Sequence, residues 1–275
     1  MTTVRLTATE LRKLFLRPRT WASLFLLCLL PTVVAMFLRV SRIAPRPGEG
    51  PAFLSAVLAN GSLYPAAALG IVLPIFLPVA VAVVAGDAVA GEAAGGTLRY
   101  LLVRPVGRTR LLLAKLVTVV AFVVVAILAV ASTALVVGLT LLPTGDAAAT
   151  VTVSGTPLTT GQLAVRTALT IGYVGWSMLG VASVSLFLST LTDSALAAAL
   201  GGLAALVAST VLVGLDAAGS VAAYLPTRYW LAWVDLFRDP ILWRDVERGV
   251  LLQGVYIGVL LAMSWANFAT RDVTS

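Results

Sequence analysis

Six long stretches without an ionisable side chain limit the folds that this chain can adopt. A bilayer core about 30 Å thick is crossed by roughly 20 predominantly apolar residues in a helix. The uncharged stretches therefore predict membrane-spanning helices over residues 20–38, 63–85, 113–142, 167–192, 194–215 and 249–270. Composition supports this interpretation, because 60% of the residues are hydrophobic and 11% are charged, whereas soluble domains are about one quarter charged. The predicted fold class is an all-α integral membrane protein with six transmembrane helices.

Two alternatives to this fold are disfavoured by the sequence. Six core helices of a soluble protein would need amphipathic helices to cover them, and the chain has none to spare. A cleaved signal peptide would end at a small-residue cleavage site, but Arg39-Val40-Ser41-Arg42 stands where cleavage should occur. We therefore expect residues 20–275 to form one six-helix membrane domain with a retained first helix.

The Lys and Arg residues indicate how these helices are oriented. Six spans place both termini on the same side of the membrane. If that side is the cytoplasm, it carries eleven of the 19 Lys and Arg residues, and the densest clusters flank the first three helices. Because cytoplasmic loops are enriched in Lys and Arg, we expect an N-in, C-in topology. The excess of arginine over lysine is typical of a GC-rich bacterial genome, so the expected location is the bacterial cytoplasmic membrane.

Residues 1–19 are expected to form an amphipathic helix on the inner membrane surface. Apolar side chains recur at helical spacing, basic side chains flank them, and Pro18 ends the pattern before the first span. The apolar stripe comprises Val4, Ala8, Leu11 and Phe15. A helix of this kind lies in the interface with its basic groups toward anionic headgroups. The simplest interpretation is a membrane anchor; the alternative is that Leu11, Arg12 and Phe15 also form an interface with a cytosolic partner.

Residues 86–112 form the largest predicted cytoplasmic connection. We expect Gly95-Gly96 to end the preceding helix and Gly107 to release the chain into the next span. Between them, Thr97 can cap a short helix that Pro105 stops. This short helix is too apolar for a free loop and is rimmed by arginines; the residues concerned are Leu98, Arg99, Tyr100, Leu101, Leu102, Arg104 and Arg108. Exposed apolar side chains of this kind indicate a protein contact, with a solvated loop as the alternative.

Residues 217–247 form an aromatic-rich segment on the predicted outer side. The segment holds three of the six tryptophans and is interrupted by Pro226 and Pro240. We expect two short helices that re-enter the outer leaflet between the fifth and sixth spans. The aromatic side chains indicate either a belt at the headgroup level or an outer gate around a translocation exit. The gate candidates are Tyr229, Trp230 and Trp233.

Catalytic and metal-binding side chains are scarce in this sequence. There is no histidine and one cysteine, Cys28, which argues against Ser–His hydrolases, an internal disulfide and Cys-based metal sites. A P-loop needs Lys followed by Ser or Thr, but Lys13 and Lys115 are each followed by Leu. We therefore expect a chain that is not an enzyme and that holds no metal or cofactor of its own.

The charges also restrict the partners and the energy source. The formal net charge is +7, but the basic residues are separated by long uncharged runs, which favours membrane lipid and cytosolic partners over nucleic acid. Secondary transporters bury ionisable groups as ion relays, whereas Asp87, Asp193 and Asp216 are expected at span ends. Prolines at 65, 74 and 78 should kink the second span, as transport helices often are. A transporter of this kind must take its energy from another subunit.

Three short motifs resemble one family of membrane transporters. Between the second and third spans stand Glu92, Gly96-Thr97-Leu98, Pro105-Val106-Gly107-Arg108 and Lys115. This pattern resembles the type-2 ATP-binding-cassette (ABC-2) exporter permeases, with Gly107 where that family often has a hydroxyl residue. Glu10-Leu11-Arg12-Lys13, together with Arg17-Pro18-Arg19, is similar to the family's interface helix. Ser189-Thr190-Leu191-Thr192-Asp193-Ser194 is similar to its connection between helices four and five.

The resemblance implies a half-transporter. Two copies of a six-helix permease would assemble with two cytosolic nucleotide-binding subunits, which would hold ATP and Mg. The segment after Gly96 would be the coupling helix that docks on the ATPase. The implied coupling residues are Glu92, Gly96, Thr97, Leu98, Arg99, Tyr100, Leu101, Pro105 and Arg108. The alternatives are a non-transporting membrane scaffold or regulatory subunit and, less favoured, an intramembrane lipid-modifying enzyme; the transported substrate stays open.

Overall fold

The computed structural model describes residues 3–41, 53–54, 56–58, 60–96, 107–143 and 158–270, and within these ranges the chain forms helices and no strand. Six helices are long and apolar enough to cross a membrane, which confirms the predicted all-α membrane fold. They are α2 (Pro18–Ser41), α4 (Phe76–Ala94), α6 (Arg108–Leu141), α7 (Thr160–Leu191), α8 (Ala195–Gly214) and α9 (Trp243–Thr270). The shorter helices are α1 (Thr3–Leu16), η1 (Ala56–Leu58), η2 (Gly61–Leu63), α3 (Tyr64–Val72), η4 (Asp216–Tyr224) and η5 (Ala232–Phe237).

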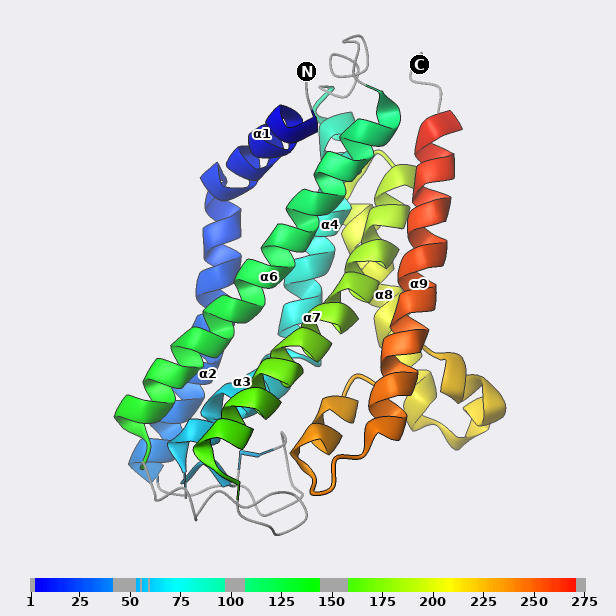
Figure 1. Ribbon diagram of the computed structural model, residues 1–275. Helices are drawn as coiled ribbons and strands as arrows, with labels where there is room; N and C mark the ends of the chain where they lie inside the picture. Colours follow the sequence, from blue (N-terminus) through cyan, green and yellow to red (C-terminus); the bar gives the residue numbers. More distant parts are fainter. Residues whose placement is uncertain are drawn as a thin grey trace.

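The long helices run side by side along one axis of the molecule (Figure 1). Helix α1, the C-terminal ends of α4 and α9 and the start of α6 lie at one end, which we call the α1 end. The start of α7, η5 and the start of α9 lie toward the opposite end. The start of α1 and the end of α9 thus share one end of the bundle, as six spans require. Which side of the membrane this end faces stays a prediction.

Helices α4 and α7 form the centre of the bundle. Helix α4 packs along both α7 and α8, α7 packs along α9, and α2 packs along α6. In α4, α6 and α7, about half of the residues in the most apolar part of the helix are buried inside the protein, whereas most of those in α9 are exposed. Apolar side chains exposed on the peripheral helices would contact lipid in a membrane.

The second predicted span is divided in two. Instead of one helix over 63–85, the chain forms α3 and then α4, which are separated at residues 73–75. Pro74 lies within this break and supplies no backbone N–H for a helical hydrogen bond. Leu73 before it keeps helical dihedral angles, and the backbone leaves the helical conformation at Ile75, with a φ of −135°. Pro65 and Pro78 instead lie in the first turns of α3 and α4, where a missing N–H leaves no helical hydrogen bond unmade.

Several helices also extend past the charges that were used to delimit the spans. Helix α4 continues beyond residue 85 to Ala94, so Asp87 lies within the helix and not at its end. Helices α6 and α9 begin at Arg108 and Trp243, before the predicted residues 113 and 249. A charge marks where a helix leaves hydrocarbon, but it does not stop the backbone hydrogen bonds of the helix. Gly95-Gly96, in contrast, ends α4 as the sequence predicted, and Gly96 has a left-handed φ of 66°.

Helix α4 is held closely by its neighbours just before it reaches the α1 end. A Cβ added to Gly86 would lie 2.8 Å from the backbone nitrogen of Ala199 in α8, so only glycine allows this approach. Ser189 of α7 donates its hydroxyl to Gly86 O at 2.6 Å and accepts from the backbone nitrogens of Val89 and Ala90 at 3.1 and 2.9 Å. These contacts fix the part of α4 that carries Asp87 and Glu92.

A sharp elbow joins α1 to α2. Helix α1 ends at Leu16 and α2 begins at Pro18. The carbonyl oxygens at the end of α1 accept hydrogen bonds from α2: Thr20 Oγ1 donates to Leu14 O and Trp21 Nε1 donates to Phe15 O, both at 2.7 Å. These bonds satisfy carbonyl groups that a helix end leaves without partners, and they fix the direction in which α1 leaves the bundle.

Candidate functional site

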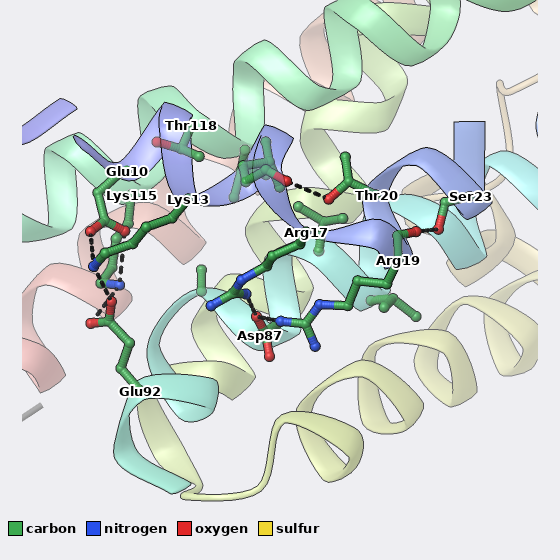
Figure 2. A pocket seen from close by; sticks show the side chains of 15 residues that line it. Glu10, Lys13, Arg17, Arg19, Thr20, Ser23, Asp87, Glu92, Lys115 and Thr118 are labelled. Atoms are coloured by element: carbon green, nitrogen blue, oxygen red, sulfur yellow. Dashed lines mark hydrogen bonds and ion pairs between the residues drawn. The ribbon is translucent and has the colours of Figure 1, made fainter. Parts of the chain in front are cut away.

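Four charged side chains from three helices meet at the α1 end. Glu10 and Lys13 come from α1, Glu92 from α4 and Lys115 from α6, and Figure 2 shows them converging on one point. Glu10, Glu92 and Lys115 are buried, while Lys13 is half-exposed. We call these four residues the ion-pair network.

The two cations and two carboxylates of the network alternate. Lys115 Nζ lies 2.8 Å from Glu92 Oε2 and 3.5 Å from Glu10 Oε2. Lys13 Nζ lies 2.7 Å from Glu10 Oε1 and 3.2 Å from Glu92 Oε1. Each lysine therefore bridges both glutamates, and the formal charges of the four groups cancel. A buried charge is tolerated only when it is paired in this way, so α1, α4 and α6 are held in one register.

The two network residues of α1 have pKa values that are shifted toward their charged forms. Burial alone would raise the pKa of Glu10, but the positive charges of Lys115 and Lys13 outweigh it and hold that pKa below its ordinary value. Burial would likewise lower the pKa of Lys13, but its hydrogen bond to Glu10 and the charges of Glu92 and Glu10 raise that pKa above its ordinary value. Both shifts favour the ionised forms of Glu10 and Lys13 near neutral pH.

We expect the stability of the protein to fall at both ends of the pH scale. The contribution of Glu10 is present above its ordinary pKa of 4.5 and is lost as the pH falls through its lowered pKa in the folded protein. The contribution of Lys13 is present below its ordinary pKa of 10.5 and is lost as the pH rises through its raised pKa. Thermal unfolding in detergent, measured across pH for wild type and Glu10→Gln, should show a shallower acid limb for the variant. Identical acid limbs would contradict a role for Glu10.

A second group of charges lies beside the network. Arg17, at the elbow, and Arg19, in the first turn of α2, both form ion pairs with Asp87 Oδ2 of α4 (Figure 2). We call these three residues the arginine clamp. Between the network and the clamp lies a pocket of about 630 Å³, including the part that is open to the surroundings. Its walls come from α1, α2, α4 and α6, so its shape depends on the relative positions of these four helices.

The start of α6 and the end of α9 are also tied together here. Arg108 donates from Nη1 to Ala269 O at 2.8 Å, and Trp265 Nε1 donates to Thr109 Oγ1 at 3.0 Å. Asn267 Nδ2 donates to Thr190 O at 2.7 Å at the end of α7. Together with the hydrogen bonds of Ser189, these contacts join α4, α6, α7 and α9 to one another at the α1 end.

The predicted coupling residues divide into two groups. Thr97, Leu98, Arg99, Tyr100, Leu101 and Pro105 lie outside the described residues. Glu92, Gly96 and Arg108 lie within them, at the two ends of that segment. The structure places Glu92 in the buried network. Arg108, the first residue of α6, donates a hydrogen bond to a backbone carbonyl of α9, and a Cβ added to Gly96 would meet open space. Their coupling role stays a prediction.

The predicted interface helix packs by a different face from its apolar stripe. Leu6, Glu10 and Leu14 are the buried side chains of α1, whereas Val4, Ala8 and Arg12 are exposed and Leu11 and Phe15 are half-buried. The apolar stripe is therefore left for lipid or a partner, and α1 binds the bundle through Glu10. A contact of Leu11, Arg12 and Phe15 with a cytosolic partner stays a prediction.

The predicted gate residues belong mainly to the protein core. Trp233 of η5 is fully buried with its ring centroid 5.8 Å from that of Phe53 and 6.2 Å from that of Phe237. Trp230 is buried as well, and Tyr229 is half-buried with its carbonyl accepting from Tyr173 OH at 2.6 Å. The segment includes η4, which is interrupted at Gly219, and η5, both of the 3₁₀ type. Their entry into a membrane and their role as a gate stay predictions.

Sequence reasoning named the charged residues of the network without pairing them. Glu92 and Lys115 are the first and last residues of the motif between the second and third spans, and Glu10 and Lys13 belong to the N-terminal motif. The spacing of Glu10 and Lys13 was the only local indication of an ion pair, because residues three apart are neighbours on a helix. Asp87 was noted only as a span end, and its ion pairs with Arg17 and Arg19 of the N-terminal motif were missed.

At this site, ion pairs join three helices. The described residues show no catalytic arrangement there. Within the described ranges, no group of three or more His, Cys, Asp or Glu side chains is placed to hold a metal ion. The network joins α1 to α4 and α6, the helices that precede and follow residues 97–106. A displacement of α4 or α6 would therefore be transmitted to α1 through these ion pairs.

The described residues form a six-helix membrane bundle whose N-terminal helix is joined by ion pairs to the helices before and after residues 97–106. A family model described as ABC-2 family transporter protein matches residues 6–191. The chain therefore belongs to the ABC-2 transporter family, and it is a multi-pass membrane permease subunit of an ABC transporter. Membership implies an ABC ATPase subunit as its partner. A comparison with curated proteins finds no match.

Proposed function

We propose that the chain is the transmembrane half of an ATP-driven exporter in the bacterial cytoplasmic membrane. Two copies would assemble with two ATPase subunits, which would hold ATP and Mg, and the α1 end would face the cytoplasm. The chain itself would contribute no catalytic residue. Its role is to convert closure of the ATPase subunits into movement of the membrane helices.

The observation that carries this proposal is the position of the ion-pair network. Glu92 lies in the last turns of α4 and Lys115 lies two turns into α6, so the network spans both ends of residues 97–106. A partner that displaces those residues would pull on two bundle helices that are joined by a buried ion pair at 2.8 Å. Because α1 is joined to the same pair through Glu10 and Lys13, the interfacial helix would move with them.

The experiment is to alter the residues that should dock and to leave the network intact. In the permease–ATPase complex reconstituted in liposomes, we expect Tyr100→Asp and Leu101→Asp to abolish most of the stimulation of ATPase activity by the permease. A charge placed in an apolar protein contact is strongly unfavourable because the contact cannot solvate it. ATP hydrolysis and assembly, followed by co-purification, are measured on the same samples.

Tyr100→Phe is the matched control, since it keeps the aromatic ring and adds no charge, and it should behave as wild type. Loss of assembly in Tyr100→Asp supports docking as directly as loss of stimulation does. Intact assembly with unchanged stimulation in both aspartate variants would refute docking by this segment. If no ATPase subunit co-purifies with the wild-type chain from native membranes, the scaffold alternative is favoured instead.

A further inference from the structure

The arginine clamp differs from the ion-pair network in its charge balance and exposure. Two guanidinium groups converge on the single carboxylate of Asp87, which leaves one positive charge uncompensated. The side chains of Arg17 and Arg19 are 39% and 54% exposed, whereas that of Asp87 is 14% exposed. The network is neutral and mostly buried; the clamp is cationic and accessible from outside the protein.

The pocket beside the clamp has the composition of a site for an amphiphile. One part of its lining is polar and includes Arg17, Arg19, Thr20 and Ser23. The other part is apolar and is provided by Leu14, Val83, Val84, Ala88 and Val119. Val83 is also partly exposed on the outer surface of α4, so the apolar part reaches the surface that lipid chains would cover.

The clamp lies at the depth where lipid headgroups are found. Helix α1 carries an exposed apolar stripe and basic side chains, which places it in the interface. The elbow at Arg17 leads directly from this interfacial helix into the spanning helix α2. Trp21, one turn further on, is exposed and donates its indole N–H to Phe15 O, and tryptophan is enriched at the headgroup level.

We propose that Arg17 and Arg19 bind the phosphate group of an anionic phospholipid in the leaflet on which α1 lies. Guanidinium groups form paired hydrogen bonds with phosphate oxygens as readily as with carboxylate oxygens. Asp87 occupies the position that the phosphate would take and competes with it for the two arginines. The acyl chains lie along Val83 and Val84. This binding site is independent of the proposed transport function, because it needs neither ATP nor a partner subunit.

The test compares lipid retention by the full-length protein in nanodiscs that contain phosphatidylglycerol and phosphatidylcholine. Retained lipid is counted by native mass spectrometry after transfer to detergent. We expect wild type to retain phosphatidylglycerol in preference, and Arg17→Gln/Arg19→Gln to lower its apparent affinity by about tenfold, as the loss of a charge-assisted hydrogen bond predicts. Arg12→Gln is the matched control: it removes one positive charge from the exposed face of α1 but does not line the pocket.

A variant that should increase lipid retention distinguishes lipid binding by the clamp from a purely structural role. Asp87→Asn removes the competing carboxylate and should increase retention of phosphatidylglycerol severalfold. Equal losses in Asp87→Asn and in the arginine variant would show that the clamp only holds the helices together. Equal retention by Arg17→Gln/Arg19→Gln and Arg12→Gln would also overturn the proposal. If the double variant does not fold, Arg19→Gln and Asp87→Asn alone still give the two opposite shifts.

A third arm identifies the source of the phosphate group. Millimolar inorganic phosphate is added during transfer from phosphatidylglycerol nanodiscs. Retention that is insensitive to phosphate supports a lipid, because the acyl chains contribute to binding. Displacement of the lipid by inorganic phosphate would show that the clamp takes a soluble anion, and the lipid proposal would fail.

Discussion

Replacing Lys115 by methionine is expected to lower the free energy of unfolding by about 3–5 kcal/mol, the usual effect of removing one partner from a buried ion pair. Methionine has a similar length but no charge, so it fills the same space between α1, α4 and α6. Glu10 and Glu92 would then share Lys13 alone, and one carboxylate charge would stay buried without compensation. The measurement is unfolding of the purified protein by sodium dodecyl sulfate in mixed micelles.

Lys13→Met is the matched control for this experiment. It removes the same charge from the same network, but the side chain of Lys13 is 41% exposed and that of Lys115 is 3% exposed. Because the side chain of Lys13 is partly exposed to the surroundings, its ion pairs are screened and its loss should cost about 1 kcal/mol or less. Equal losses for the two variants would contradict the buried position of Lys115.

A double variant distinguishes charge imbalance from poor packing. Lys115→Met/Glu92→Gln removes one cation and one carboxylate, which leaves Glu10 and Lys13 as a balanced pair at 2.7 Å. We expect this variant to be more stable than Lys115→Met alone, because the uncompensated charge is gone. Simple addition of the two single effects would show that Lys115 and Glu92 act independently, which their 2.8 Å separation in the structure argues against.

The number of membrane helices could be predicted because charged side chains are rare in the bilayer core. The helix ends could not be predicted from the same rule, since Asp87 and Glu92 both lie in α4 without ending it. What ends helices here is backbone chemistry: Pro74 interrupts the second span, and Gly95-Gly96 ends α4. Proline and glycine positions were therefore better predictors of helix ends than charge was.

The packing face of α1 shows why the network was missed. On the sequence alone, the apolar stripe that begins at Val4 was expected to face the membrane, and no face of this helix was expected to pack against the bundle. The face that packs against the bundle is Leu6, Glu10 and Leu14, in which a glutamate stands between two leucines. A charged residue in that position is buried only because Lys115 of α6 lies opposite it. Contacts between residues so far apart in the chain cannot be deduced from the periodicity of either helix alone.

Residues 217–247 show that a sequence can indicate an important segment without indicating its environment. Its aromatic residues and two short helices were evident in the sequence, but their environment was not. Trp233 contacts Phe53, which lies before α3 and is therefore far from Trp233 in the sequence. The sequence pattern gave Phe53 no role. The aromatic content therefore indicated an important segment but could not distinguish a gate from a packed core.

Replacing Trp233 by alanine tests that distinction. We expect the free energy of unfolding to fall by about 3 kcal/mol, at the lower end of the range for removing a buried tryptophan. Trp233 is fully buried against Phe53 and Phe237, and its removal would leave a cavity beside these two rings. Unfolding in mixed micelles measures the loss. Trp243→Ala, at an exposed tryptophan in the first turn of α9, should change stability by about 0.5 kcal/mol or less.

Trp233→Phe separates packing from gating, because it keeps an aromatic ring against Phe53 and removes only part of the volume. If Trp233 is a core residue, the phenylalanine variant should recover most of the stability, and transport in the reconstituted complex should follow stability across the series. If Trp233 is a gate, Trp233→Phe and Trp233→Ala should alter ATP-driven transport while the free energy of unfolding stays near that of wild type. The complete burial of Trp233 and its contact with a residue that precedes α3 favour the first outcome, since a gating side chain must be able to leave its contacts when the pathway opens.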